Sequence, residues 1–211
     1  MILETIKNEI IKYGDIIESK GFSPGASGNI SLRYEDKIII TSSGSSNGNL
    51  AYEDLVLIDF EGNCLEASSG KKPSSEKMLH VEFYKKRPDV NAIIHVHPVF
   101  LSSFAAARKN LEAPVMAENV YYFGKIPLAD YALPSSMELV NNTAKYFDKY
   151  NAILMANHGF IVGDVDLEQA YLKLELAESY AQIVLNANLL GGPVLLTEKE
   201  VAQIEALKSE K

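Results

Sequence analysis

The chain has 211 residues, of which 47% are hydrophobic and 23% charged, and its formal net charge at pH 7 is −8. This composition is typical of a globular chain that buries a substantial core, so we expect a single domain over residues 1–211. Because acidic residues are in excess and the lysines and arginines are scattered, nucleic acids and anionic membrane surfaces are poor candidates as partners.

The redox and targeting signals favour the cytoplasm. Cys64 is the only cysteine and cannot form an internal disulfide. The first residues resemble the start of an amphipathic helix and lack the layout of a signal peptide, and no apolar run is long enough to span a membrane. We therefore expect a cytoplasmic protein.

The first part of the chain predicts a helix followed by short strands. Apolar residues at helical spacing from Ile2 to Ile17 predict an amphipathic helix. Residues 30–34 and 37–41 predict a β-hairpin, and further strands are expected at 55–60 and around Cys64. The segments 21–29 and 41–48 are too rich in glycine and serine for regular structure. The second of them has the composition of a phosphate-binding loop, although most such segments are only connections.

Residues 72–80 predict the beginning of a helix that runs to about Lys86. Ser74 or Ser75 is expected as its N-cap, which places Glu76 in the first turn. The free N–H groups at a helix start favour an anion, but an acidic residue there is also ordinary compensation of the helix dipole. His80 follows one turn later, and we interpret it as a packed or hydrogen-bonded residue.

Two histidines stand two residues apart at the end of the apolar run 91–98. Side chains at i and i+2 of a strand share one face, so His95 and His97 are expected side by side, with Pro98 closing the strand. His158 follows another apolar run, in a predicted turn where Asn157 and Gly159 are expected to take positive φ. Three histidines at strand ends favour Zn²⁺ or a similar ion, with one coordination position left for water or substrate.

The remaining segments predict supporting structure. A helix is expected at 99–108, a strand at 125–128, and a helix capped by Ser135 or Ser136 that runs to about 146. Two strands then flank the turn at His158, and a long helix is expected to begin at Asp164 or Asp166. A last short helix is expected at 197–208. The aromatic residues at 114–124 favour a core or a subunit interface rather than catalysis.

Five short motifs, taken together and in order, resemble the class II aldolase/adducin family and specifically its fuculose-1-phosphate aldolase-like members. They are Gly28-Asn29, Ser43-Gly44, Pro73-Ser74-Ser75-Glu76, His95-Val96-His97 and Asn157-His158-Gly159. The resemblance covers nearly the entire chain. It implies an α/β fold, an α/β/α sandwich with a mostly antiparallel central sheet flanked by helices. It also implies a homotetramer whose active sites lie between neighbouring subunits.

The resemblance also implies roles for individual residues. It assigns one Zn²⁺ per subunit to His95, His97 and His158. Glu76 is implied as the proton-transfer residue, able to approach the metal when substrate is absent. The implied phosphate-binding residues are Gly28, Asn29, Ser43, Gly44, Ser74 and Ser75. The reaction implied is reversible cleavage of a ketose 1-phosphate, such as L-fuculose 1-phosphate, to dihydroxyacetone phosphate and a small aldehyde.

Other activities remain open within the same family. A methylthioribulose-1-phosphate dehydratase would use the same zinc and glutamate, whereas pentulose-phosphate epimerases carry aspartate where Glu76 stands. An adducin-like interaction domain has the fold without the metal site. The fuculose-phosphate enzymes use one tyrosine in the region of residues 116–119 and another near the C-terminus, and this chain has neither. The group that protonates the aldehyde oxygen therefore stays open among Glu118, Tyr121 and Tyr122.

Overall fold

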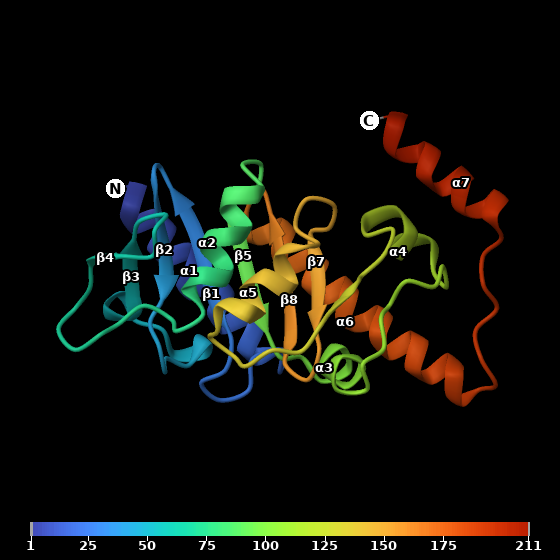
Figure 1. Cartoon of the computed structure of the whole chain (residues 1–211), viewed down its shortest axis with the longest axis horizontal. Helices are drawn as coiled ribbons and strands as arrows, with labels where there is room; N and C mark the ends of the chain where they lie inside the picture. Colours follow the sequence, from blue (N-terminus) through green and yellow to red (C-terminus); the bar gives the residue numbers. More distant parts are fainter. Residues whose placement is uncertain (1, 211) are drawn as a thin grey trace.

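The computed structural model describes residues 2–210, so residues 1 and 211 of the expected domain lie outside the described range. One sheet of eight strands organises this part of the chain. The strands are β1 (Asn29–Tyr34), β2 (Lys37–Thr41), β3 (Leu55–Ile58), β4 (Cys64–Glu66), β5 (Ala92–Val96), β6 (Leu128–Ala129), β7 (Ala152–Met155) and β8 (Gly159–Asp164). Their order across the sheet is β4-β3-β2-β1-β5-β8-β7-β6 (Figure 1). Every neighbouring pair is antiparallel except β6 with β7.

Helices cover both faces of this sheet. They are α1 (Ile2–Ser19), α2 (Lys77–Lys86), α3 (Val99–Ala106), α4 (Ala117–Tyr122), α5 (Met137–Ala144), α6 (Leu167–Leu189) and α7 (Glu198–Ala206). One buried core joins α2 and α5 to one face, and a second joins α1, α3 and α6 to the other (Figure 1). The predicted α/β/α sandwich with a mostly antiparallel sheet is confirmed. None of the helices in the described part combines the length and apolar character needed to cross a bilayer.

The beginning of α2 differs from the prediction. The N-cap is Glu76 and the helix starts at Lys77, so neither Ser74 nor Ser75 caps it. The reason is a tertiary contact: Pro73 forms a β-bridge with Ser42, and Ser74 N–H donates to the Thr41 carbonyl. Backbone that is paired as a strand cannot also be helical, so the helix begins only where this pairing ends.

Other element boundaries resolve the alternatives that the sequence left open. Asp166 caps α6 by accepting a hydrogen bond from Gln169 N–H at 2.7 Å, whereas Asp164 is the last residue of β8. Ser136, not Ser135, caps α5. The strand expected at 125–128 is reduced to β6. The aromatic-rich stretch 114–124 contains α4, which packs against α7 at the side of the molecule away from β4 (Figure 1, right).

Candidate metal centre and adjoining cavity

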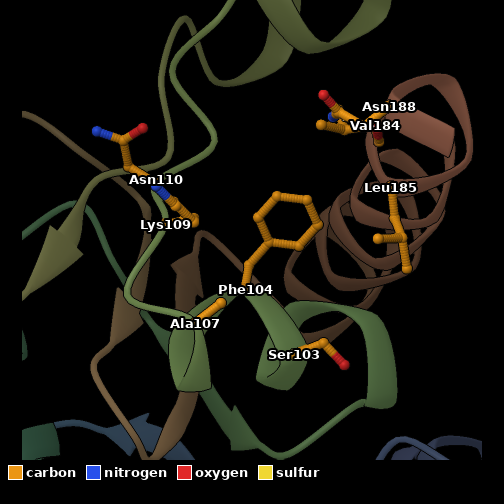
Figure 2. Close-up of a pocket in the computed structure, with 8 residues that line it drawn as sticks. All are labelled: Ser103, Phe104, Ala107, Lys109, Asn110, Val184, Leu185 and Asn188. Carbon is orange, nitrogen blue, oxygen red and sulfur yellow. Dashed lines mark hydrogen bonds between the residues drawn. The ribbon is translucent and has the colours of Figure 1, made fainter. Parts of the chain in front are cut away.

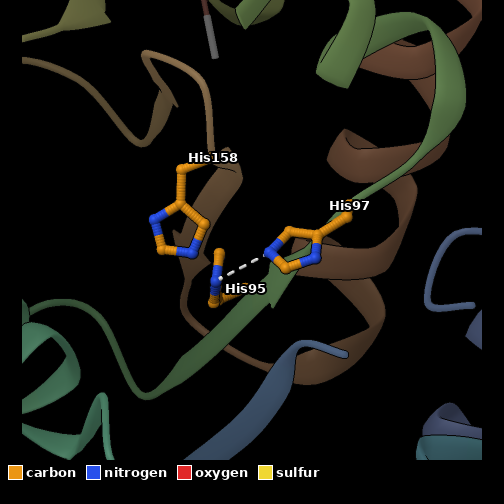
Figure 3. A group of neighbouring side chains, drawn as sticks. All are labelled: His95, His97 and His158. Atoms are coloured by element: carbon orange, nitrogen blue, oxygen red, sulfur yellow. Dashed lines mark hydrogen bonds between the residues drawn. The ribbon is translucent and has the colours of Figure 1, made fainter. Parts of the chain in front are cut away.

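Three histidines from two distant parts of the chain meet beside the centre of the sheet. His95 lies in β5, His97 follows the end of that strand, and His158 lies in the turn between β7 and β8. β5 pairs with β8, which places the turn next to the strand end. The ring centroids are 4.9, 4.9 and 5.2 Å apart, and the nitrogens available for ligation all lie within 4.8 Å of one another (Figure 3). The prediction that the three imidazoles share one site is confirmed.

Asn157 and Gly159 shape the turn that presents His158, but for different reasons. Asn157 has φ of 53°, as expected, and its side chain accepts a hydrogen bond from Arg108. Gly159 does not have positive φ, so that part of the prediction is wrong. Its role is steric, because a Cβ atom there would overlap the His97 ring and lie 2.8 Å from the Val96 carbonyl oxygen. Glycine is required so that β8 can approach the end of β5 closely.

We expect Gly159→Ala to weaken metal binding, because the added methyl group forces the His97 ring out of place. Disturbing the support of a ligand typically costs 10- to 100-fold in metal affinity, and we expect a loss of about that size. Gly163→Ala is the matched control: it lies on the same strand, but its Cβ would meet Phe83 and Val90 at 3.0 Å. The control should lower the melting temperature and leave metal affinity unchanged. Equal metal affinity in both variants would contradict the steric role of Gly159.

His95 is held in one orientation by a backbone contact. Its ring is completely buried, and Nδ1 lies 2.9 Å from the carbonyl oxygen of Phe160. A carbonyl oxygen only accepts, so Nδ1 carries the proton and Nε2 points toward the other two histidines. Such a hydrogen bond fixes both the tautomer and the ring plane of a metal-ligating histidine.

Glu76 lies against this group of rings. Its Oε2 is 3.0 Å from His95 Nε2 and accepts a hydrogen bond from Asn29 Nδ2 at 3.4 Å, while Oε1 is 3.4 Å from His158 Nε2. Burial alone would raise the pKa of Glu76, but His95 and His158 hold it well below its usual range. Burial would likewise lower the pKa of His95, but Glu76 raises it overall. The carboxylate therefore stays ionised beside the histidines.

The donor set suits a divalent cation. Burial, together with the neighbouring histidines, lowers the pKa of His97 to about 3 and that of His158 to about 4, so both rings are neutral at pH 7. Neutral imidazole nitrogens are ligands for zinc and for similar divalent ions. Within the described residues, the buried Oε1 of Glu76 has no hydrogen-bond partner. A cation among these atoms would neutralise the carboxylate and use lone pairs that nothing else occupies.

A cavity of about 320 Å³ opens above this group. His97, His158 and Glu76 form part of its wall, whereas His95 lies beneath it, fully buried. The six predicted phosphate-binding residues all line it: Gly28, Asn29, Ser43, Gly44, Ser74 and Ser75. Segments that are far apart in the sequence thus meet around one space, and neither a lysine nor an arginine is among the described residues that line it.

Sequence reasoning missed several residues that line or support this cavity. Ser135 lies in the wall with φ of 66°, and its hydroxyl donates to Ser75 Oγ at 2.9 Å. Ala26, Ser27, Ser42 and Pro134 complete the lining. The sequence carries no signal for this role of Ser135, because its positive φ, which is uncommon for a residue other than glycine, is visible only in the structure.

Asp54 stabilises the serine-rich loop at residues 41–48 through hydrogen bonds. Its Oδ1 accepts hydrogen bonds from Ser42 and Ser45, both at 3.3 Å, and pairs with Lys71 Nζ at 2.5 Å. Its Oδ2 accepts from Ala51 N–H at 3.1 Å. Burial opposes the charge, but these donors, Lys71 first, lower the pKa of Asp54 overall. A buried carboxylate with this many donors fixes the loop conformation.

Glu178 of α6 performs a similar task for the segment that follows His97. Its two carboxylate oxygens accept the N–H groups of Phe100 and Leu101, each at 2.8 Å, and so cap the first turn of α3. Burial raises the pKa of Glu178, and the two backbone donors oppose that rise. Because α3 begins two residues after His97, this contact fixes the path of the chain that leaves the metal centre.

A second cavity, of about 450 Å³, lies between α3 and the C-terminal part of α6 (Figure 2). Phe104, Val184 and Leu185 contribute apolar side chains to its lining, which also includes Lys109 and Asn188. None of the described residues that line it is a histidine or carries a carboxylate, so this cavity offers no group for metal binding or proton transfer.

The chain belongs to the class II aldolase and adducin family. The family model described as "Class II Aldolase and Adducin N-terminal domain" matches residues 8–185. Combined with the histidine triad, this membership makes the chain a metal-dependent enzyme of the class II aldolase type. The resemblance to this family that five short motifs indicate is confirmed.

Three known proteins illustrate the breadth of that family. The L-fuculose phosphate aldolase of Methanocaldococcus jannaschii is 35% identical over 85% of this chain and 95% of its own length. The 3-oxo-tetronate 4-phosphate decarboxylase of Haemophilus influenzae is 32% identical over 94% of this chain and 95% of its own. A solved L-fuculose 1-phosphate aldolase superposes with a TM-score of 0.90 at 30% identity, covering 97% of this chain and 96% of the other.

Proposed function

We propose that this protein is a zinc-dependent aldolase that reversibly cleaves a ketose 1-phosphate, such as L-fuculose 1-phosphate, to dihydroxyacetone phosphate and a small aldehyde. The observation that carries the proposal is the meeting of three histidines, Glu76 and three small-residue loops around one cavity. Relatives named as fuculose phosphate aldolases, with 30–35% identity over most of the chain, support it.

The reaction requires a site for negative charge. When the C3–C4 bond breaks, its electron pair stays on C3 and is delocalised onto the C2 oxygen, while the C4 hydroxyl loses its proton and becomes an aldehyde. A zinc ion held by His95, His97 and His158 would supply a Lewis acid for the substrate oxygens. The buried position of His95 keeps this side of the site free of bulk water.

Glu76 is proposed to carry the proton at C3. It would deliver that proton to form the hydroxymethyl group of dihydroxyacetone phosphate and remove it in the reverse direction. Its carboxylate lies at the cavity wall and is ionised, which suits removal of a proton.

The small-residue loops are proposed to bind the phosphate. Gly28 and Asn29, Ser43 and Gly44, and Ser74 and Ser75 offer hydroxyl, amide and backbone donors on one wall of the cavity. Gly28 has φ of 76°, and a Cβ atom there would lie 2.5 Å from the His95 carbonyl oxygen, so this loop sits directly against the strand that bears the ligands. Phosphate held there would fix the distance from the reacting carbons to the histidines.

We also propose that the protein forms a homotetramer and that it is located in the cytoplasm. Support for assembly comes from the exposed apolar residues at the end of α6 and in the segment that follows, where Leu190 and Val194 are 88% and 92% exposed. Exposed apolar patches of this kind commonly mark protein interfaces.

A panel of phosphorylated ketoses with products identified by mass tests the proposed reaction. The aldolase releases dihydroxyacetone phosphate from its substrate, and full activity in thoroughly chelated protein would contradict metal dependence. Decarboxylation of a 3-oxo-tetronate 4-phosphate is the second candidate, favoured by the similarity to the Haemophilus influenzae enzyme. It would also form dihydroxyacetone phosphate, but with carbon dioxide in place of the aldehyde, so the second product separates the two reactions. A methylthioribulose-1-phosphate dehydratase or an epimerase would release neither product.

A further inference from the structure

A chain of buried hydrogen bonds connects Glu76 to the interior of the protein on the side away from the cavity. Asn29 Nδ2 faces Glu76 Oε2 at 3.4 Å, and the other end of the same amide, Oδ1, lies 2.5 Å from His80 Nε2. His80 Nδ1 lies 2.7 Å from Ser31 Oγ, which in turn lies 2.8 Å from the Tyr84 hydroxyl. Asn29 and Ser31 belong to β1, and His80 and Tyr84 belong to α2.

These groups are shielded from water. His80 and Ser31 are completely buried, Tyr84 is 1% exposed and Asn29 is 5% exposed. Leaving a buried polar group without a partner is strongly unfavourable, so each hydrogen bond constrains the next one. No solvent molecule is needed to complete the chain, since each ring nitrogen of His80 has a partner in the protein.

Only one direction of donation is compatible with the ionised carboxylate. Glu76 can only accept, so Asn29 must present its NH₂ group to it and its carbonyl oxygen to His80. That oxygen also only accepts, so His80 must carry its proton on Nε2. A neutral His80 then accepts at Nδ1 from the Ser31 hydroxyl. Burial lowers the pKa of His80 to about 3, in agreement with a neutral ring.

We propose that His80 is a positioning residue for Glu76: its Nε2–H group fixes the side-chain amide of Asn29 so that the NH₂ end holds the Glu76 carboxylate in place. The inference rests on the proposed function of Glu76 and adds to it a residue that lies outside the cavity wall. If the amide rotated by 180°, its oxygen would face the carboxylate and its NH₂ group would face His80 Nε2–H, and both contacts would be repulsive.

The kinetic test compares two substitutions at position 80, with the protein fully loaded with metal. Glutamine can extend an N–H donor toward Asn29 and an oxygen toward Ser31, whereas leucine can do neither. We expect His80→Leu to lower kcat about 10- to 100-fold, the usual effect of losing an outer hydrogen-bond partner, with little change in KM or metal content. His80→Gln should restore most of kcat. An unchanged kcat in a folded His80→Leu protein would overturn the proposal.

A spectroscopic test does not depend on activity or on the leucine variant folding. ¹⁵N NMR of the wild-type imidazole rings reports which nitrogen carries the proton. We expect His80 to be neutral and protonated at Nε2 at pH 7, and Asn29→Asp, which cannot donate to Glu76, to change the His80 signals. A His80 ring protonated at Nδ1 would overturn the assigned direction of the hydrogen bonds.

The two proposals can fail separately. If no ketose phosphate is cleaved but His80 is the Nε2–H tautomer, the reaction assigned to the site is wrong and the arrangement of Asn29 stands. If dihydroxyacetone phosphate is released and His80→Leu keeps full kcat, the reaction stands and His80 does not position Glu76.

Discussion

His158→Ala is expected to abolish metal binding at stoichiometric level and to reduce kcat/KM about 1000-fold or more. A bound metal would lower the free energy of the charged transition state by several kcal/mol. Each 1.36 kcal/mol corresponds to a factor of ten in rate, which gives the expected loss. His158 is the best of the three ligands to replace, since it lies in a turn and its removal disturbs neither core. Metal analysis and steady-state kinetics provide the measurements.

Circular dichroism and the melting temperature of the metal-free proteins serve as controls for this variant. His158→Ala and chelated wild-type protein should have similar spectra, and both should lack activity. Adding excess metal should restore the wild-type protein but not the variant. A His158→Ala protein that retains one tightly bound ion per chain would contradict the assignment of this histidine as a ligand.

Glu76→Gln is expected to lower kcat by about 100- to 10,000-fold, the range typical of losing a positioned general acid or base. Glutamine keeps the shape of the side chain and can still accept a hydrogen bond from Asn29, but it cannot take up or deliver the proton. The ligating nitrogens of His95, His97 and His158 remain, so metal content should stay at one ion per chain. Stopped assays for dihydroxyacetone phosphate and metal analysis measure the two quantities.

Glu82→Gln is the matched control, because it removes one carboxylate charge from α2, the helix that Glu76 caps, at a position that does not line the cavity. It should leave kcat within the error of the wild-type value. Retention of normal kcat by Glu76→Gln would show that another group transfers the proton, and loss of the metal in that variant would show that the carboxylate is itself needed as a ligand.

The metal centre could be predicted because its signal is local. Two imidazoles two residues apart on a strand must share a face, and that geometry holds in any fold in which residues 92–96 form β5. Predicting that His158 lies beside them required the further expectation that the strand ends meet. The other site residues were predicted only from the resemblance to a family. For the fold, the periodicity of apolar residues predicted the individual helices and strands. The arrangement of the sheet was predicted from the resemblance.

What could not be predicted depends on contacts between distant segments. The start of α2 is displaced by the pairing of Pro73 with Ser42, which no local propensity encodes. Gly159 is glycine because the His97 ring occupies the space of its side chain, and not because of its own backbone angle. His80 was correctly interpreted as a hydrogen-bonded residue, but its partners on β1 are about 50 residues away in sequence. Tertiary packing decides such features.

The position of β5 within the sheet has a practical consequence for work on the enzyme. The strand is hydrogen-bonded to β1 on one side and to β8 on the other, so two ladders and two apolar cores hold it whether or not an ion is bound. Zinc fingers, by contrast, unfold when their zinc ion is removed. A single preparation can therefore be emptied and recharged in turn with zinc, cobalt or manganese, and the turnover of each form compared on an unchanged scaffold.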